Sequence, residues 1–272
     1  MNFADTDRFA VQIRREIIKM IAAAGSGHPS GSLSAADIIA VLYNDILNVD
    51  PDDPGKYDRD RFVLSKGHAA PALYAALALK GFFPVEELAD LRKLGSRLQG
   101  HPDMHKLPGI DMSTGSLGQG ISAACGMAMV SKMDGLKNRV YALLGDGETQ
   151  EGQVWEAAML AAHYKLDNLT AFLDHNHLQI DGRITDVMSP EPEAAKWRAF
   201  GWHVIGIDGH DTAAIRTAVR EAHSIQGKPT MIIAETVKGK GVSFMEDQAG
   251  WHGVAPNSEQ AQQALAELFW ED

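Results

Sequence analysis

The chain has 272 residues, 45% of them hydrophobic, which is enough for one large domain. Its formal net charge of −11 excludes the basic surface that nucleic acid or an anionic membrane requires, so we expect neither partner. The single cysteine excludes an internal disulfide. No apolar stretch is long enough to span a membrane, and the charged, amphipathic N-terminus is unlike a signal peptide, so we expect a cytoplasmic protein.

The first half of the chain alternates helical patterns with glycine-rich loops. Apolar residues at helical spacing from Phe9 to Ala24 predict a helix that stops at GSGHPSG. The stretch SAAD, from Ser34 to Asp37, resembles a capping box ahead of the helical pattern IIAVLYNDIL. A short strand is predicted at RFVLS, and a long loop, LQGHPDMHKLPGIDMSTGSLGQG, precedes the small-residue helix ISAACGMAMVSKM.

From Arg139 onward, strand and helix patterns alternate regularly. The predicted strands are VYALLG, LTAFLDHN, WHVIGID and PTMIIAETV, with helices between them, the first over residues 151–165. This alternation predicts a single α/β domain over residues 1–272, with a mainly parallel sheet covered by helices on both faces. Ligands on such sheets bind beyond the carboxyl ends of the strands. The residues expected at that edge are Asp146, Asn176, His210 and Lys238.

The stretch YALLGDGETQEG places the carboxylate of Asp146 between two glycines at the end of an apolar strand. Taken alone, GDG is more typical of a solvated turn. Asn176 follows the next strand, so its amide oxygen reaches the same edge if the two strands are neighbours. Oxygen ligands of this kind suit Mg²⁺ or Ca²⁺ with phosphate as a further ligand. Gly145 and Gly147 permit close backbone approach, and a helix starting near Thr149 directs N–H groups at an anion, which predicts a metal–diphosphate site.

Six motifs extend this pattern along nearly the whole chain. They are SGHPSGSLS, DRFVLSKGHAAPALYAAL, LQGHPD, STGSLGQGIS, GDGETQEGQVWEA and ETVKGKG…WHG. In their order and spacing, together with FLDHNHLQIDG, the chain resembles the N-terminal region of transketolases, which carries the thiamine diphosphate (ThDP) fingerprint. The resemblance covers about Arg8 to Ala255 and implies a ThDP-binding fold.

The resemblance implies a role for each matching position. Mg²⁺, for which Ca²⁺ or Mn²⁺ could substitute, would be bound by Asp146, Asn176 and the carbonyl of Leu178. The cofactor-binding residues implied, besides Asp146 and Asn176, are His68, Gly115, Leu117 and Gly147. The catalytic residues implied are His28, His101 and His252, which would line the substrate channel, and Glu151, which with Glu156 would link two active sites across a dimer.

Several of these positions also have a purely structural explanation. His28 and His101 lie in turn-like sequences, and the segment before His252 differs in length and composition from that of many transketolases. Glu151 at a helix start is also explained by the helix dipole. Lys66 receives no role. Seven histidines match no family position and are expected to be structural or exposed: His105, His163, His175, His177, His203, His210 and His223.

The resemblance ends before the domain that carries the glutamate needed to activate ThDP in this family. The amphipathic C-terminal stretch NSEQAQQALAELFWED looks like a finished terminus, so we expect a split enzyme rather than a fragment. The implied partner is a C-terminal transketolase subunit with that glutamate, in a two-plus-two heterotetramer that transfers a two-carbon ketol unit between sugar phosphates. The small-residue segment STGSLGQGISAACGMAM is the expected interface.

Three other functions compete with this one. The α subunit of a 2-oxo acid dehydrogenase shares the GDG…N motif, but the histidine motifs suit a hydroxyl-rich sugar better. A non-catalytic ThDP-binding or scaffolding protein would lack the partner. A zinc hydrolase is disfavoured because neither HExxH nor a Cys/His ligand spacing is present.

Overall fold

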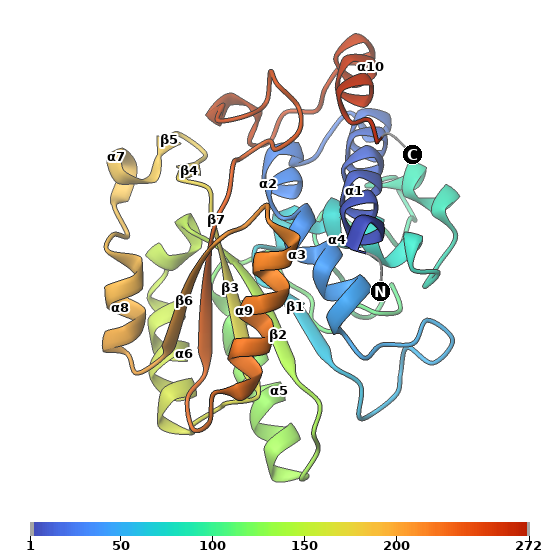
Figure 1. Cartoon of the computed structure of the whole chain (residues 1–272). Coiled ribbons are helices and arrows are strands. Elements are labelled where there is room, and N and C mark those ends of the chain that lie inside the picture. The colour runs from blue at the N-terminus through green and yellow to red at the C-terminus, as the bar shows by residue number, and fades with distance from the viewer. Residues whose placement is uncertain (1–2, 271–272) are drawn as a thin grey trace.

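A parallel five-stranded sheet forms the centre of the structure, a computed structural model that describes residues 3–270 (Figure 1). The strand order is β1-β2-β3-β7-β6, and every neighbouring pair is parallel. The strands are β1 (Arg61–Leu64), β2 (Val140–Gly145), β3 (Leu169–His175), β6 (His203–Asp208) and β7 (Thr230–Glu235). The α/β class and the parallel sheet predicted from the sequence are confirmed.

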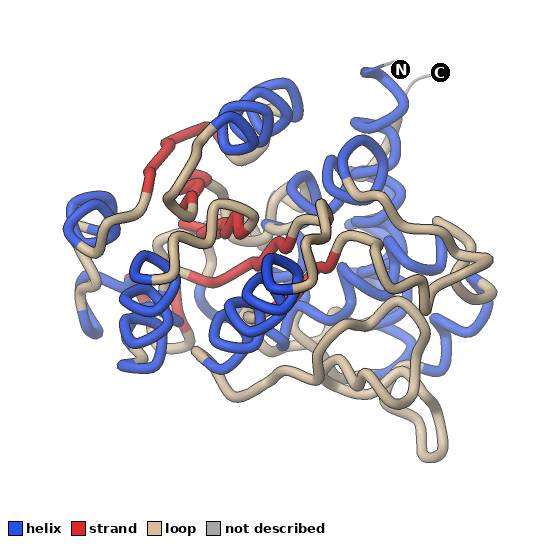
Figure 2. The backbone as a smooth tube through the Cα atoms, turned by 90° about the horizontal axis from the view of Figure 1, so that it is seen from below, coloured by secondary structure: helices blue, strands red, loops and turns tan. Residues whose placement is uncertain are grey.

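Helices cover both faces of this sheet, as the view in Figure 2 shows. One side holds α1 (Phe3–Ala24), α2 (Pro29–Ser34), α3 (Ala36–Val41), α4 (Ala70–Leu79) and α9 (Thr212–Ser224), with α10 (Ser258–Glu267) packed on α1. The other side holds α5 (Gln119–Met133), α6 (Gly152–His163) and α8 (Glu193–Ala199). Within residues 3–270, none of these helices is long and apolar enough to cross a membrane.

The continuous apolar run of β2 follows from its burial on both faces. Tyr141 and Leu143 pack in the core beneath α1, α3 and α4. Val140, Ala142 and Leu144 face the opposite core, beneath α5 and α6. Because successive side chains of a strand point to opposite faces, a strand covered on both sides needs no polar alternation.

Short elements near the carboxyl edge of the sheet were not expected from the sequence. A 3₁₀ turn, η4 (Gly147–Gln150), follows β2, and α6 begins only at Gly152, so the predicted helix start near Thr149 is wrong by one short turn. After β3 come a small hairpin of β4 (Leu178–Gln179) and β5 (Gly182–Arg183), and the helix α7 (Ile184–Met188). The remaining short helical segments are η1 (Leu42–Ile46), η2 (Gly67–Ala69), η3 (Val85–Asp90) and η5 (Ala249–Trp251).

The predicted capping box at Ser34 to Asp37 is also wrong. Ser34 is the last residue of α2, and its hydroxyl donates to Asp174 Oδ2 over 2.6 Å. The N-cap position of α3 is Ala35, which makes no side-chain capping bond. Asp37 instead pairs with Arg14 and His210. The buried carboxylate of Asp174 on β3 needs hydrogen-bond donors, and the Ser34 hydroxyl is one of them, so it does not cap a helix.

Candidate functional site

A cavity of about 340 Å³ lies where β2, β3 and β7 end. Because β2 and β3 are neighbours, with Gly145 opposite Asp174, the segments that follow them meet at this edge as predicted. Ten of the predicted site residues line the cavity: His28, His68, Gly115, Leu117, Asp146, Gly147, Glu151, Asn176, Leu178 and His252. The eleventh, His101, lies just outside, with its ring centroid 6.4 Å from that of His28.

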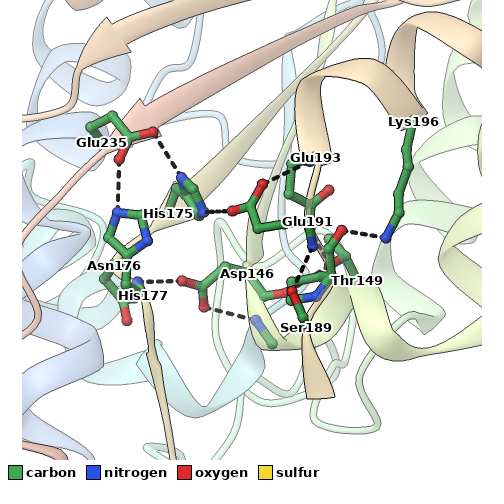
Figure 3. Close-up of polar contacts among 12 residues, drawn as sticks. Asp146, Thr149, His175, Asn176, His177, Ser189, Glu191, Glu193, Lys196 and Glu235 are labelled. Carbon is green, nitrogen blue, oxygen red and sulfur yellow. Dashed lines mark hydrogen bonds and ion pairs between the residues drawn. The ribbon is translucent and has the colours of Figure 1, made fainter. Parts of the chain in front are cut away.

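Asp146 is held with both carboxylate oxygens fixed (Figure 3). Oδ1 accepts a hydrogen bond of 2.7 Å from the Gly147 amide, and Oδ2 accepts one of 2.6 Å from the His177 amide. Only 2% of the residue is exposed, and burial, together with the nearby charge of Asp174, raises the pKa of Asp146 above its usual value. A carboxylate desolvated to this degree favours a cation beside it.

The oxygens predicted to share that cation lie on the segment after β3. Asn176 is buried, and its side-chain oxygen accepts a hydrogen bond of 3.3 Å from the Leu178 amide. The Leu178 carbonyl accepts a hydrogen bond of 2.8 Å from Nζ of Lys238, which is itself buried. Burial and the charge of Lys66 lower the pKa of Lys238 to about 8. Carboxylate, amide and carbonyl oxygens are the donors that a hard divalent cation prefers, and these three residues line the same cavity, so the donor set fits Mg²⁺.

Three histidines converge on the other wall of the cavity. The ring centroids of His28, His68 and His252 are 5.4 Å apart in each pairing. Burial lowers their pKa values, to about 4 for His28 and about 3 for His252, so these rings are neutral at pH 7. The Nδ1 atoms of His28 and His252 are buried and make no hydrogen bond within residues 3–270. Unsatisfied ring nitrogens in a polar cavity favour a hydroxyl-bearing ligand.

Two glycines let backbone and ring atoms approach one another at the site. A Cβ on Gly115, whose φ is +151°, would lie 3.1 Å from the His101 ring. A Cβ on Gly67 would lie 2.7 Å from the Gly115 amide nitrogen. The loops that carry His68 and His101 can therefore pack closely only with glycine at both positions.

Lys66, for which the sequence indicates no role, lines the cavity and belongs to a buried polar cluster there. Its ammonium pairs with the carboxylate of Asp174 and donates to the Gly31 carbonyl over 2.9 Å. The hydroxyls of Ser34 and Thr236 complete the shell around Asp174. Burial favours the neutral acid, yet the Lys66 charge holds the pKa of Asp174 below its usual value. The cluster ties the loop after β1 to the ends of β3 and β7.

Replacing Lys66 with methionine is expected to lower the free energy of unfolding by about 3–5 kcal/mol, because the Asp174 charge is left buried without a partner. Urea denaturation followed by circular dichroism measures the change. The matched control is Lys93→Met, which removes an exposed pair with Asp90 at 2.8 Å and should cost under about 1 kcal/mol. Equal losses in the two variants would contradict the structural role of Lys66.

Glu148 is a further residue of the site that the sequence does not indicate, although it directly follows GDG. Its Oε1 accepts hydrogen bonds from the Ser65 hydroxyl at 2.5 Å and the Gly118 amide at 2.8 Å. Its Oε2 accepts one of 3.1 Å from the Gly145 amide. One buried carboxylate thus joins the segment after β1, the loop before α5 and the end of β2. The sequence carries no signal for this role because the partners are backbone amides and a distant serine.

Most of the histidines expected to be structural have polar partners. His210 bonds Asp37 through Nδ1 at 2.6 Å and accepts from the Val237 amide, so it reaches the edge of the sheet but not the cavity. His223 bonds the Tyr141 hydroxyl, and His203 bonds Glu221. His175 and His177 instead form a separate cluster with Glu235 (Figure 3).

The predicted role of Glu151 stays a prediction. The residue is exposed at the mouth of the cavity and precedes α6, where its side chain makes no capping bond. Glu156, on the first turns of α6, is exposed as well. A carboxylate that lies at a helix start without capping it is free to contact another chain.

Comparison with known proteins decides the family. Residues 6–272 match the family model described as transketolase, thiamine diphosphate binding domain. The chain belongs to this family. It is 51% identical over 264 residues to the 6-deoxy-6-sulfo-D-fructose transketolase subunit SqwG of Clostridium sp. (strain MSTE9), covering 97% of this chain and 96% of that one. It is 44% identical to one of the apulose-4-phosphate transketolase subunits of Phocaeicola vulgatus, covering 94% of this chain and 90% of that one.

The structure agrees with solved transketolases. It superposes on transketolase from Campylobacter jejuni with a TM-score of 0.93 at 35% identity, covering 98% of this chain but only 43% of that one. The predicted transketolase-type fold and the function as the ThDP-binding part of a ketol-transferring enzyme are thereby confirmed. The family match also decides against the α subunit of a 2-oxo acid dehydrogenase and against a zinc hydrolase.

Proposed function

We propose that this chain is the N-terminal subunit of a two-subunit transketolase that moves a two-carbon ketol unit from a ketose to an aldose. The observation that carries the proposal is the cavity itself, in which a buried carboxylate and neutral, unsatisfied histidines face one another at the edge of the sheet. Relatives matched over 96% and 90% of their own length are named as transketolase subunits, which supports the split form. The chain spans 43% of the C. jejuni transketolase, so a partner would supply the rest.

The cofactor-binding side of the cavity would hold Mg²⁺ and ThDP. Asp146, the Asn176 side chain and the Leu178 carbonyl would bind the metal, for which Ca²⁺ or Mn²⁺ could substitute. The residues that would contact ThDP are His68, Gly115, Leu117 and Gly147. When bound, ThDP supplies the carbon nucleophile that accepts and releases the two-carbon unit. The fixed orientation of Asp146 supports this assignment, because its two backbone hydrogen bonds hold the carboxylate before a metal binds.

His28 and His252 would bind the sugar. Neutral imidazoles can both donate and accept hydrogen bonds, and the Nδ1 atoms of His28 and His252 have no partner within residues 3–270 and could bind hydroxyls. The positive charges of Lys66 and Lys238 add to the effect of burial in disfavouring protonation of these rings. His101 would complete the channel from the loop beside Gly115. The two subunit relatives are named for a sulfo sugar and a sugar phosphate, so we propose an anionic sugar as donor.

The partner would be a C-terminal transketolase subunit that carries the activating glutamate, in a two-plus-two heterotetramer in the cytoplasm. The exposed side chains of Val130 and Met133, three residues apart on α5 and thus on one face of the helix, support an interface there, because adjacent exposed apolar groups often mark an interaction site. Glu151, at the mouth of the cavity, would link the two active sites of the assembly.

Alanine at His28 or at His101 is expected to lower ketol-transfer kcat/KM by about 10²-fold or more, because each removes a polar contact to the reacting sugar. The assay uses the complex with a candidate C-terminal subunit and a panel of sulfo- and phosphoketose donors. ThDP affinity, measured by calorimetry, should change far less than turnover. His105→Ala, in the exposed part of the following loop, is the matched control. Full activity of both variants with every accepted donor would refute the channel assignment, and no transfer from any donor by the wild-type complex would refute the proposed function.

A further inference from the structure

A cluster outside the cofactor cavity brings two histidines and a glutamate together at the ends of β3 and β7. His175 Nδ1 lies 2.8 Å from Glu235 Oε1, and His177 Nε2 lies 2.9 Å from Glu235 Oε2. One ligand atom from each of the three residues lies within 4.8 Å of the others, the only such His/Cys/Asp/Glu group within residues 3–270. Figure 3 shows the two rings facing the same carboxylate. We infer that His175, His177 and Glu235 form a second metal site, which takes a Zn²⁺-class ion.

The choice of ion follows from the donor set. Two imidazole nitrogens and one carboxylate are the three-ligand set of open zinc sites, in which water fills the fourth position. Mg²⁺ prefers an all-oxygen environment and would remain with Asp146 and Asn176. The side chains of His177 and Glu235 are 43% and 54% exposed, so an ion can enter from solvent, whereas His175 is only 7% exposed and anchors the site.

The hydrogen bond on the far side of His175 supports the assignment independently. Its Nε2 lies 2.8 Å from Glu191 Oε1, which leaves Nδ1 directed at the proposed ion. The Glu191 carboxylate is itself held, because its Oε2 accepts a 3.0 Å hydrogen bond from the Glu193 amide. A carboxylate behind a metal-binding histidine fixes the orientation of the ring and raises its basicity. The ion would replace the proton that His175 Nδ1 now shares with Glu235.

An ion at this position would have a structural consequence. His175 ends β3, Glu235 ends β7, and Glu191 lies beyond the β4–β5 hairpin and α7. Asn176 and Leu178 belong to the segment between these anchors. The ion would therefore clamp the segment that carries two of the proposed Mg²⁺ ligands, without itself touching the cofactor.

Zinc binding to the full chain tests the inference. Isothermal calorimetry with Zn²⁺, in excess Mg²⁺ and without ThDP, should show one site in the wild type. His177→Ala should weaken this site at least about tenfold, and Glu191→Gln by about 10–100-fold, the range typical for loss of an outer carboxylate. Co²⁺ in place of Zn²⁺ should give the visible absorption of a low-coordinate nitrogen–oxygen site, and this band should be lost in His177→Ala.

The controls separate this site from other histidines and from the cofactor site. His203→Ala removes a His–Glu pair of 2.8 Å that lacks a third ligand, and it should leave zinc binding unchanged. His28→Ala should also retain zinc binding, which makes the result independent of the proposed function. Circular dichroism verifies that each variant is folded. Wild-type affinity in both His177→Ala and Glu191→Gln, or equal loss in His28→Ala, would overturn the inference.

Discussion

Replacing Asp146 with alanine is expected to abolish ThDP binding while the protein stays folded. Asp146 is buried at the cavity and is the one anionic ligand proposed for the metal, so without it the metal that neutralises the diphosphate would have only neutral oxygens to bind. The fold should survive, because within residues 3–270 the side chain bonds only the amides of Gly147 and His177 and is not part of the hydrophobic core. Removing a buried carboxylate also relieves its desolvation cost.

Calorimetric titration with ThDP and Mg²⁺ measures this effect, and thermal unfolding verifies the fold. Asn176→Ala should weaken binding less, because water can replace a neutral ligand. Asp52→Ala, in the exposed loop before β1, is the matched control and should bind as the wild type does. Unchanged ThDP affinity in Asp146→Ala would show that the metal is held elsewhere.

The second large effect concerns the chain by itself, which is expected to show no ketol transfer until its partner is added. In the proposed split enzyme this chain supplies only part of the cofactor site, and its cavity opens to solvent beside Glu151 and the β4–β5 hairpin. ThDP should therefore bind weakly to the isolated chain, and adding the C-terminal subunit should restore both affinity and turnover.

Light scattering combined with the ketol-transfer assay tests this requirement. The mixture should give a two-plus-two assembly, and Val130→Asp on α5 should weaken that assembly without changing the fold of the chain, because the side chain is half exposed. The matched control is Val254→Asp, which changes a similarly exposed valine on the segment before α10 and should leave the assembly intact. Robust transketolase activity from this polypeptide alone would refute the split-enzyme proposal.

The sheet and the place of the site could be predicted from the sequence because both depend on local patterns. Apolar runs ending in GDG and in DHN mark the ends of β2 and β3, and the topology of parallel sheets brings such ends to one edge. The family motifs then placed His28, His68 and His252 in the same cavity, which the structure shows.

The parts that could not be predicted depend on partners distant in sequence. Lys66 pairs with Asp174, which is 108 residues away, and Glu148 accepts from Ser65, which is 83 residues away. Ser34 has the spacing of a helix cap, but a buried carboxylate on β3 takes its hydroxyl. No local pattern indicates which of several competing hydrogen-bond partners a serine or a lysine will bind.

The order of the strands has a consequence for how this protein folds. At the starts of β1 and β2, the Arg139 amide donates a hydrogen bond to Asp60, which is 79 residues away in the sequence. At the ends of β3 and β7, His175 bonds Glu235, which is 60 residues away. To form such a contact, the chain must first lose the conformational entropy of a large loop, and the contact stabilises the chain only afterwards. Folding is therefore expected to be slow. The cavity exists only after these strands have paired, so a ligand bound there shifts the equilibrium of the whole chain toward the native state by mass action. ThDP and its metal would then bind only after the sheet has formed, and would stabilise the native state of a slowly folding chain.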